Sequence, residues 1–274
     1  MRASAQGGYA VKLTVQQVID GLMQPGGAAV QTVDALKFGD PHAQVTGIVT
    51  AFLPTRQVLE RAVGLGANLV IVHEGAFYTH HDSGPPIDDP VAAAKLEWIE
   101  QSGLAIFRIH DHIHHRHRPD GIMEGLVQAL DWDAYIDEHR DAYSLFNLPE
   151  TTLGELAQTV KARLGIPYVR VIGSPDMRCR KVGALVGYRG GAATAIPVLG
   201  REGADVVLYG EGPEWETPEY VRDANAYGIA KGAIVLGHAE SESPGMRLLA
   251  ERLGERYPGL PVHYAGERPL FQVM

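Results

Sequence analysis

Cysteine is almost absent from this chain of 274 residues, since Cys179 is the only one. A single cysteine cannot form an intrachain disulfide, so a reducing cytoplasm is the expected compartment. Arg178 and Arg180 flank this residue and would lower the pKa of its thiol. No partner motif lies nearby, however, and we expect an inert thiol.

Long apolar runs and an excess of positive charge are also missing. No stretch of about 18 apolar residues occurs, so we expect no membrane-spanning helix. The first eight residues lack the apolar core of a signal peptide. The formal net charge is −9, from 24 Lys and Arg against 33 Asp and Glu. Unspecific nucleic-acid binding needs a basic surface and is therefore not expected.

The chain does have the size and the pattern of an α/β protein. Hydrophobic residues make up 45% of it, enough for one large domain or two smaller ones. Short β-branched runs alternate with segments that open on helix-capping residues, which predicts α/β layers around mostly parallel or mixed sheets. The polar stretch 131–141 is the best boundary candidate and gives the halves 1–135 and 136–274.

The expected elements follow from local signals. Helices should begin at N-capping residues or at first-turn prolines, which fall at Thr14, Pro54, Asp89, Asp120, Thr151, Thr217 and Pro244. Another helix should follow a glycine turn near Ala192. Strands are expected at 45–52, 68–73, 104–109, 169–172, 182–186, 205–209 and 233–236.

Histidine is concentrated in one place. Five of the twelve histidines fall within residues 110–117, directly after the expected strand 104–109. On an extended backbone alternate residues share a face, so His110, His112 and His114 would point the same way. Converging imidazoles suit a divalent transition metal such as Zn, Fe, Ni or Cu. The alternative is a solvated basic loop, because arginines follow at once.

Two other expected strand ends carry similar side chains. The expected strand 68–73 ends in His73 and Glu74, and two more histidines follow shortly. The last expected strand is followed by His238 and Glu242, which are four residues apart and close enough to reach one ion. In open α/β sheets ligands bind at the carboxyl ends of strands. Mixed nitrogen and oxygen donors at three such ends favour Zn, Mn or Fe over Ca or Mg.

A glycine-rich turn at 187–191 lies between an expected strand and an expected helix. Its backbone amides, strengthened by Arg189, would suit an anion, although a turn of this kind is more often only a tight connection. Glu211 follows the next expected strand and is placed to support a metal ligand.

The order of these motifs resembles the NIF-three-like dinuclear-metal-centre family, whose members are often described as GTP cyclohydrolase I type 2 homologs. The resemblance spans about residues 45–265, and its most specific part is the segment 237–242, at a matching distance after Gly210-Glu211. It implies two interlocked α/β lobes with mixed sheets flanked by helices. It also implies two metal ions in the cleft between the lobes, and a homohexamer built from trimers.

Two positions depart from the pattern of that family. Glu74 stands where the family has a second histidine, and it would ligate through oxygen. The bridging aspartate position falls on His114, or its role passes to Asp111 or His112. Because an imidazole does not bridge two metals as a carboxylate does, we expect weaker occupancy of a second site and one or two ions per chain. The other implied ligands match the family: His73, His110, His238 and Glu242.

The predicted function is that of a metal-dependent, hydrolase-like protein acting on a small nucleotide or phosphoester. A metal-bound water, its pKa lowered toward neutrality, would attack a phosphoester or a cyclic C–N bond, with Glu211 or Glu240 as general base. The alternative is a non-catalytic oligomeric scaffold or regulatory interaction protein, in which ions hold the lobes together. Open coordination positions would favour catalysis, and a closed ligand set a structural role.

Overall fold

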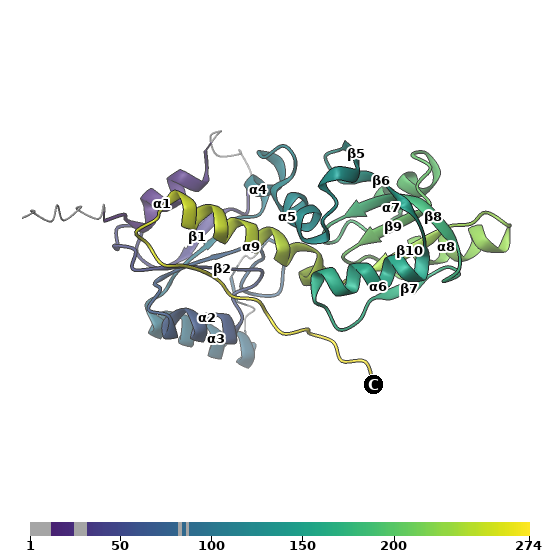
Figure 1. Ribbon diagram of the computed structural model, residues 1–274. Coiled ribbons are helices and arrows are strands. Elements are labelled where there is room, and N and C mark those ends of the chain that lie inside the picture. Colours follow the sequence, from purple (N-terminus) through teal and green to yellow (C-terminus); the bar gives the residue numbers. More distant parts are fainter. Residues whose placement is uncertain (1–11, 25–31, 82–83, 86–87) are drawn as a thin grey trace, which may run out of the picture. The chain divides into compact units, whose positions relative to one another are not determined.

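The computed structural model describes residues 12–24, 32–81, 84–85 and 88–274, which form two compact α/β units (Figure 1). The signal-peptide prediction refers to residues outside this part of the chain. The first unit runs up to His110 and includes 249–265, whereas the second comprises 111–248 and 266–274. The division falls inside the histidine run and differs from the boundary expected near residue 135. The chain returns to the first unit because strand β11 (Val262–Tyr264) pairs with strand β2 (Ile48–Ala51).

The first unit is built on a five-stranded sheet. Its further elements are α1 (Val15–Leu22), β1 (Ala35–Phe38), α2 (Arg56–Gly64), β3 (Leu69–Val72), α3 (Pro90–Ser102) and β4 (Ala105–Arg108). The strand order is β1-β4-β3-β2-β11, and all neighbours are parallel except β1 and β4. Every residue of β2, β3 and β4 is buried, as expected for parallel strands covered on both faces. Figure 1 shows α2 and α3 together over one of these faces.

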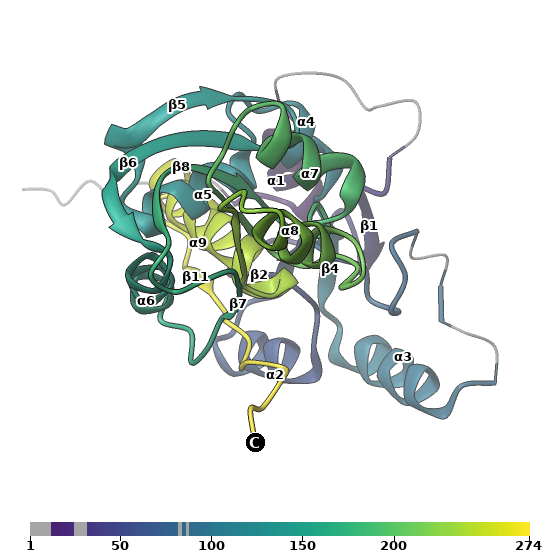
Figure 2. The ribbon, with the colours of Figure 1, turned by 90° about the vertical axis from the view of Figure 1, so that its right-hand side faces the viewer.

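The second unit holds a six-stranded sheet. It contains α4 (Asp111–His115), α5 (Gly121–Leu130), a 3-10 turn (Asp133–Tyr135), β5 (Ile136–His139), β6 (Ser144–Thr152), α6 (Leu153–Leu164), β7 (Arg170–Ile172), β8 (Arg178–Leu185), α7 (Ala192–Gly200), β9 (Val206–Tyr209), α8 (Thr217–Ala226), β10 (Gly232–Val235) and the start of α9 (His238–Arg256). The order is β5-β6-β8-β9-β10-β7, with β8, β9 and β10 parallel and the other neighbours antiparallel. Figure 2 shows α7 and α8 side by side over one face of this sheet.

The predicted α/β class is confirmed, with two mixed sheets flanked by helices. Several helix starts follow the predicted capping chemistry. Thr14 forms a capping box with Gln17, Asp89 accepts the N–H of the third residue of α3, and Asp120 accepts two N–H groups of α5. These caps satisfy backbone donors that have no partner inside the helix.

Two predicted helix starts are wrong. The helix expected at Pro54 begins at Arg56, because the side chain of Thr55 provides the N-cap. The helix expected around Pro244 already begins at His238, so this proline lies inside α9. A first-turn position is the commonest place for proline in a helix, because a proline further in removes one backbone hydrogen bond, and this preference misplaced the start of α9.

The single cysteine lies buried in β8. Burial raises the pKa of the Cys179 thiol to about 11, and the nearby carboxylates of Asp205 and Glu155 act in the same direction. The neighbouring arginines point to the exposed side of the strand and do not activate it. The expectation of an inert thiol fits this environment.

None of the helices in the described ranges combines the length and the apolar character that crossing a lipid bilayer requires.

Candidate metal centre

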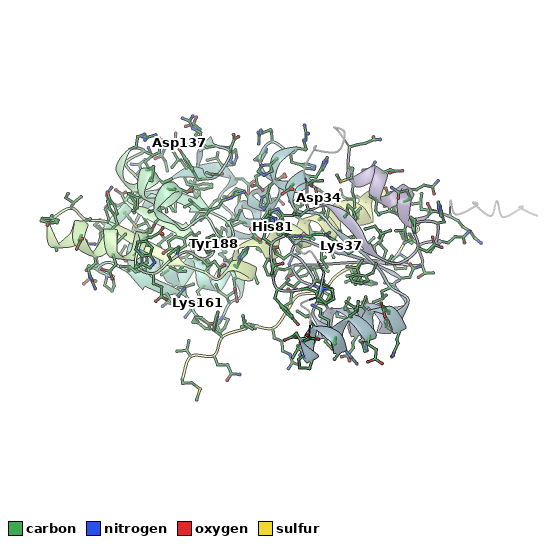
Figure 3. All side chains as sticks on the ribbon, turned by 180° about the vertical axis from the view of Figure 1, so that it is seen from behind. Asp34, Lys37, His81, Asp137, Lys161 and Tyr188 are labelled. Carbon is green, nitrogen blue, oxygen red and sulfur yellow. The ribbon has the colours of Figure 1, made fainter. Side chains whose placement is uncertain are left out.

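The carboxyl ends of β3 and β4 lie at one edge of the first sheet, because these strands are parallel neighbours. His73 and Glu74 follow β3, and His110 follows β4. The rings of the two histidines are stacked, with centroids 4.6 Å apart. The backbone N–H of His110 donates to Asp34 Oδ1 at 2.6 Å (Asp34 is labelled in Figure 3). This edge therefore gathers two imidazoles and one carboxylate, as the sequence predicted.

Arg108, the last residue of β4, is fully buried beside these side chains. Its Nη2 donates to Glu74 Oε2 at 2.7 Å, and its Nε donates to the backbone oxygen of His73 at 3.1 Å. Glu74 Oε1 lies 3.5 Å from His110 Nε2. Burial by itself would raise the pKa of Glu74, but His110, His73 and Arg108 hold it at about 2. Glu74 is therefore ionised, with one oxygen fixed by Arg108 and the other directed toward His110.

In the second unit, α9 begins directly after Gly237, whose φ of +110° makes the sharp turn out of β10. His238 and Glu242 lie one helical turn apart, with Nε2 and Oε2 separated by 3.2 Å. His238 Nδ1 lies 3.0 Å from Glu211 Oε1. Burial by itself would lower the pKa of His238, but the two carboxylates raise it to about 10. His238 is then an imidazolium at neutral pH, and a cation bound between these carboxylates has to replace its proton.

His114 in α4 has a carboxylate behind its ring. Its Nδ1 lies 2.8 Å from Asp120 Oδ2, and Arg189 Nη1 donates to the same oxygen at 3.0 Å. Burial by itself would raise the pKa of Asp120, but His114 and Arg189 hold it at about 2. An ionised carboxylate only accepts hydrogen bonds, so Asp120 favours a proton on Nδ1 and leaves Nε2 as the nitrogen that could face a metal. That Nε2 lies 3.9 Å from Glu242 Oε1.

Three of the predicted ligands share one arrangement. The Nδ1 atom faces an oxygen acceptor, which is a backbone carbonyl for His73 and a carboxylate for His114 and His238. Histidines that ligate metals are usually oriented in this way, because the outer acceptor fixes the ring and increases its basicity. Together with Glu74, the first unit therefore presents imidazole and carboxylate groups that could hold a metal ion, and His114, His238 and Glu242 supply the same donor types in the second unit.

The prediction that residues 110–114 are extended is wrong. The strand ends before this run, and Asp111–His115 forms helix α4. Because each helical residue turns by about 100°, His112 and His114 point in different directions. The ring of His112 meets that of His117 edge-on instead, with centroids 5.6 Å apart. Alternate histidines suggested a period of two, but the aspartate in the first turn stabilises a helix N-terminus.

The remaining predicted residues occupy less direct positions. Asp111 lies in the first turn of α4. Among the described residues, Asp111, His112 and His238 belong to no group of three potential ligand atoms within 4.8 Å of one another, although His238 lies close to Glu242. The hydrogen bond with His238 lowers the pKa of Glu211, which acts as the orienting partner of that ring. Glu240 lies in the first turn of α9, against Gly237. Their roles as ligands or general bases stay predictions.

Sequence reasoning missed three supporting residues, namely Arg108, Asp120 and His80. A signal existed for Arg108, because a charged residue that ends an otherwise apolar strand needs a buried partner. Asp120 was identified only as a helix start, and His80 only as a histidine near a strand end. Their partners lie far away in the sequence or across a loop, so local patterns do not reveal them.

The chain is similar to known proteins over most of its length. The sequence model of the family described as Duf34/NIF3 (NGG1p interacting factor 3) matches residues 14–266. The chain is 23% identical over 227 residues to a protein of Clostridium acetobutylicum named GTP cyclohydrolase 1 type 2 homolog, covering 80% of each chain.

Solved structures show the same fold. A protein named ybgI, of unknown function, has a TM-score of 0.74 at 23% identity, with 94% of this chain and 99% of that one covered. A Bacillus cereus protein related to NIF3 has a TM-score of 0.71 at 16% identity, with 96% and 99% covered. The resemblance drawn from the motifs is thereby confirmed. Since the family match extends over most of the sequence, the chain belongs to the Duf34/NIF3 family.

Proposed function

We propose that this protein binds divalent transition-metal ions and acts as a hydrolase on a small nucleotide or phosphoester. The observation that carries the proposal is the shared orientation of three histidines, each with Nδ1 against an oxygen acceptor and a carboxylate ligand in the same unit. The residues that would hold the ions are His73, Glu74, His110, His114, His238 and Glu242.

The bound ion would act as a Lewis acid and supply a nucleophilic water at neutral pH. The chain's own residues would orient the donors and move a proton. Asp120 and Arg108 keep His114 and Glu74 in place. Glu211, half-exposed and with a lowered pKa, would accept a proton at Oε2 while Oε1 stays on His238. Glu240 is the other candidate base.

The name of the Clostridium acetobutylicum relative supports a nucleotide as the first substrate to test. The purified full chain should copurify with about one to two divalent transition-metal ions, measured by plasma emission spectroscopy. A panel of GTP, other nucleoside phosphates and phosphodiesters should then reveal turnover that chelation removes. His238→Ala should abolish this turnover.

The outcomes separate the alternatives. Less than about a tenth of an equivalent of metal per chain in undialysed protein would contradict the proposed metal binding, and with it the proposed hydrolysis. Bound metal without turnover, combined with a lower melting temperature after chelation, would favour the alternative of a non-catalytic scaffold.

We further expect a homohexamer in the cytoplasm, on the basis of the family resemblance and of the single cysteine. Light scattering checks the assembly, and a mass near that of one chain at micromolar concentration would contradict it.

A further inference from the structure

One histidine of the first unit stands outside the ligand positions that the family resemblance implies. His80 lies in the segment after β3, a few residues beyond Glu74. Glu74, His80 and His110 each offer one potential ligand atom, and these three atoms lie within 4.8 Å of one another. All three residues belong to the first unit, so their arrangement is complete within it.

Arg108 holds two of these three residues. Its Nη1 donates to the backbone oxygen of His80 at 2.5 Å, while its Nη2 donates to Glu74 Oε2 at 2.7 Å and lies 3.4 Å from His80 Nδ1. The ring of His80 meets that of His110 edge-on, with centroids 4.8 Å apart. A fully buried guanidinium needs such acceptors, so Arg108 ties the loop to the end of the strand.

The donor types are those of an open metal site. Two imidazoles and one carboxylate bind zinc in hydrolases and iron(II) in non-haem enzymes, and in both cases coordination positions remain for water or substrate. The charge of Arg108 offsets that of Glu74, so a bound dication keeps much of its charge for an anionic ligand. Phosphate or carboxylate groups would therefore be the preferred additional ligands.

We propose that His80 is a further metal ligand, which completes a three-ligand site with Glu74 and His110 within the first unit. Arg108 is the positioning residue that restricts Glu74 to one coordinating oxygen. The inference rests on the proposed function in that the chain must bind metal, but it requires neither hydrolysis nor a given substrate.

The test uses the full chain after metal removal with a chelator. Zn²⁺ is titrated in competition with a chromogenic chelator, and Co²⁺ absorption reports the number of ligands. The variants are His80→Asn, the matched control His81→Asn on the neighbouring residue (labelled in Figure 3), and His110→Asn. Circular dichroism melting confirms that each variant folds, which is expected for the exposed residues 80 and 81.

Removal of His80 should weaken Zn²⁺ binding by about tenfold or more and change the Co²⁺ spectrum, while His81→Asn should bind as the unmodified chain does. The inference is overturned if His80→Asn binds like the unmodified chain while His110→Asn binds more weakly, an outcome that leaves the proposed function intact. If the unmodified chain binds no Zn²⁺, both the inference and the proposed function fail.

Discussion

The two units support their candidate ligands with buried charges of opposite sign. In the first unit the carboxylate of Glu74 is held by the buried cation Arg108 at 2.7 Å. In the second unit the imidazole of His114 is held by the buried anion Asp120 at 2.8 Å. Glu74 and His114 are also positions at which the motif resemblance predicts a departure from the usual ligands of the family. In each unit the candidate ligand is therefore paired with a buried group of opposite charge, a cation behind a carboxylate and an anion behind an imidazole.

The two ligand sets also differ in how they hold protons. The pKa of Glu74 lies at about 2, so this ligand is ionised at neutral pH. The pKa of His238 lies at about 10, so this ligand carries a proton that a metal must displace. Metal binding in the second unit should therefore release a proton at neutral pH, whereas at Glu74 it should not.

The largest expected effect comes from breaking the ion pair of the first unit. Arg108→Met leaves the carboxylate of Glu74 without its buried partner, and the free energy of unfolding should fall by about 3–5 kcal/mol. Urea unfolding measures this loss. The control is Arg56→Met, which removes an exposed partner of Glu60 and of the Trp98 ring and should cost less than about 1 kcal/mol. Equal losses in the two variants would contradict the comparison.

The second prediction concerns pH in the second unit. Because the pKa of His238 is raised from 6.5 to about 10, its protonated form stabilises the metal-free fold. This stabilisation is complete below the unfolded pKa and is lost as the pH rises through about 10. Unfolding in the presence of chelator should therefore show stability falling by a few kcal/mol from pH 7 to above 10.

His238→Gln should remove most of that slope, and His81→Gln should keep it. Zn²⁺ affinity should move in the opposite direction and rise with pH over the same range, because the metal and the proton compete for one ring. A slope that is equal in all three proteins would show that the interaction of His238 with Glu211 and Glu242 does not persist in solution.

The third prediction separates the charge of Asp120 from its role as a helix cap. Asp120→Asn should still cap α5, because asparagine is as good an N-cap as aspartate. It removes the anion behind His114 and Arg189, so metal affinity should fall by about 10–100-fold, while circular dichroism should show that α5 is retained. Competition titration with Zn²⁺ measures the affinity. Asp89→Asn, at the cap of α3, is the matched control and should leave metal binding unchanged.

The smallest effect is expected from Glu211→Gln, because this side chain is half-exposed and the amide still accepts a hydrogen bond from His238. Metal affinity should fall by about tenfold or less. The pKa of His238 should move down, which ¹H–¹⁵N NMR of the imidazole can follow. A loss as large as that of Asp120→Asn would indicate that Glu211 itself ligates.

The sequence indicated those features that depend on neighbours in the chain. The positions of His73 and His238 after buried strands are as predicted, because apolar β-branched runs and the glycine that follows them are local signals. Helix starts at Thr14, Asp89 and Asp120 were found for the same reason. The carboxyl-edge rule for α/β sheets then placed the candidate ligands correctly at strand ends.

What the sequence did not indicate depends on distant partners. The contact of Arg108 with the loop at His80 joins residues 28 positions apart, and no periodicity reports such a contact. Histidines occur at alternate positions of the run, as in a strand, and yet the run forms a helix. Its backbone conformation is set by local helix propensity and by the end of the sheet just before it. The pairing of β11 with β2 joins segments from opposite ends of the chain, and for this reason the division of the units was not foreseen.

That pairing has a consequence for folding during synthesis on the ribosome. The first sheet lacks its final strand until residues 262–264 have been synthesised, so the open edge of β2 waits while the whole second unit is made. All residues of β2 are buried in the folded protein, so its edge is a site for mispairing with other nascent chains while it stays unpaired. The second unit can form its sheet earlier, since all six of its strands are contiguous in the chain from β5 to β10. The sheet whose strands are synthesised first is therefore completed after the sheet of the second unit.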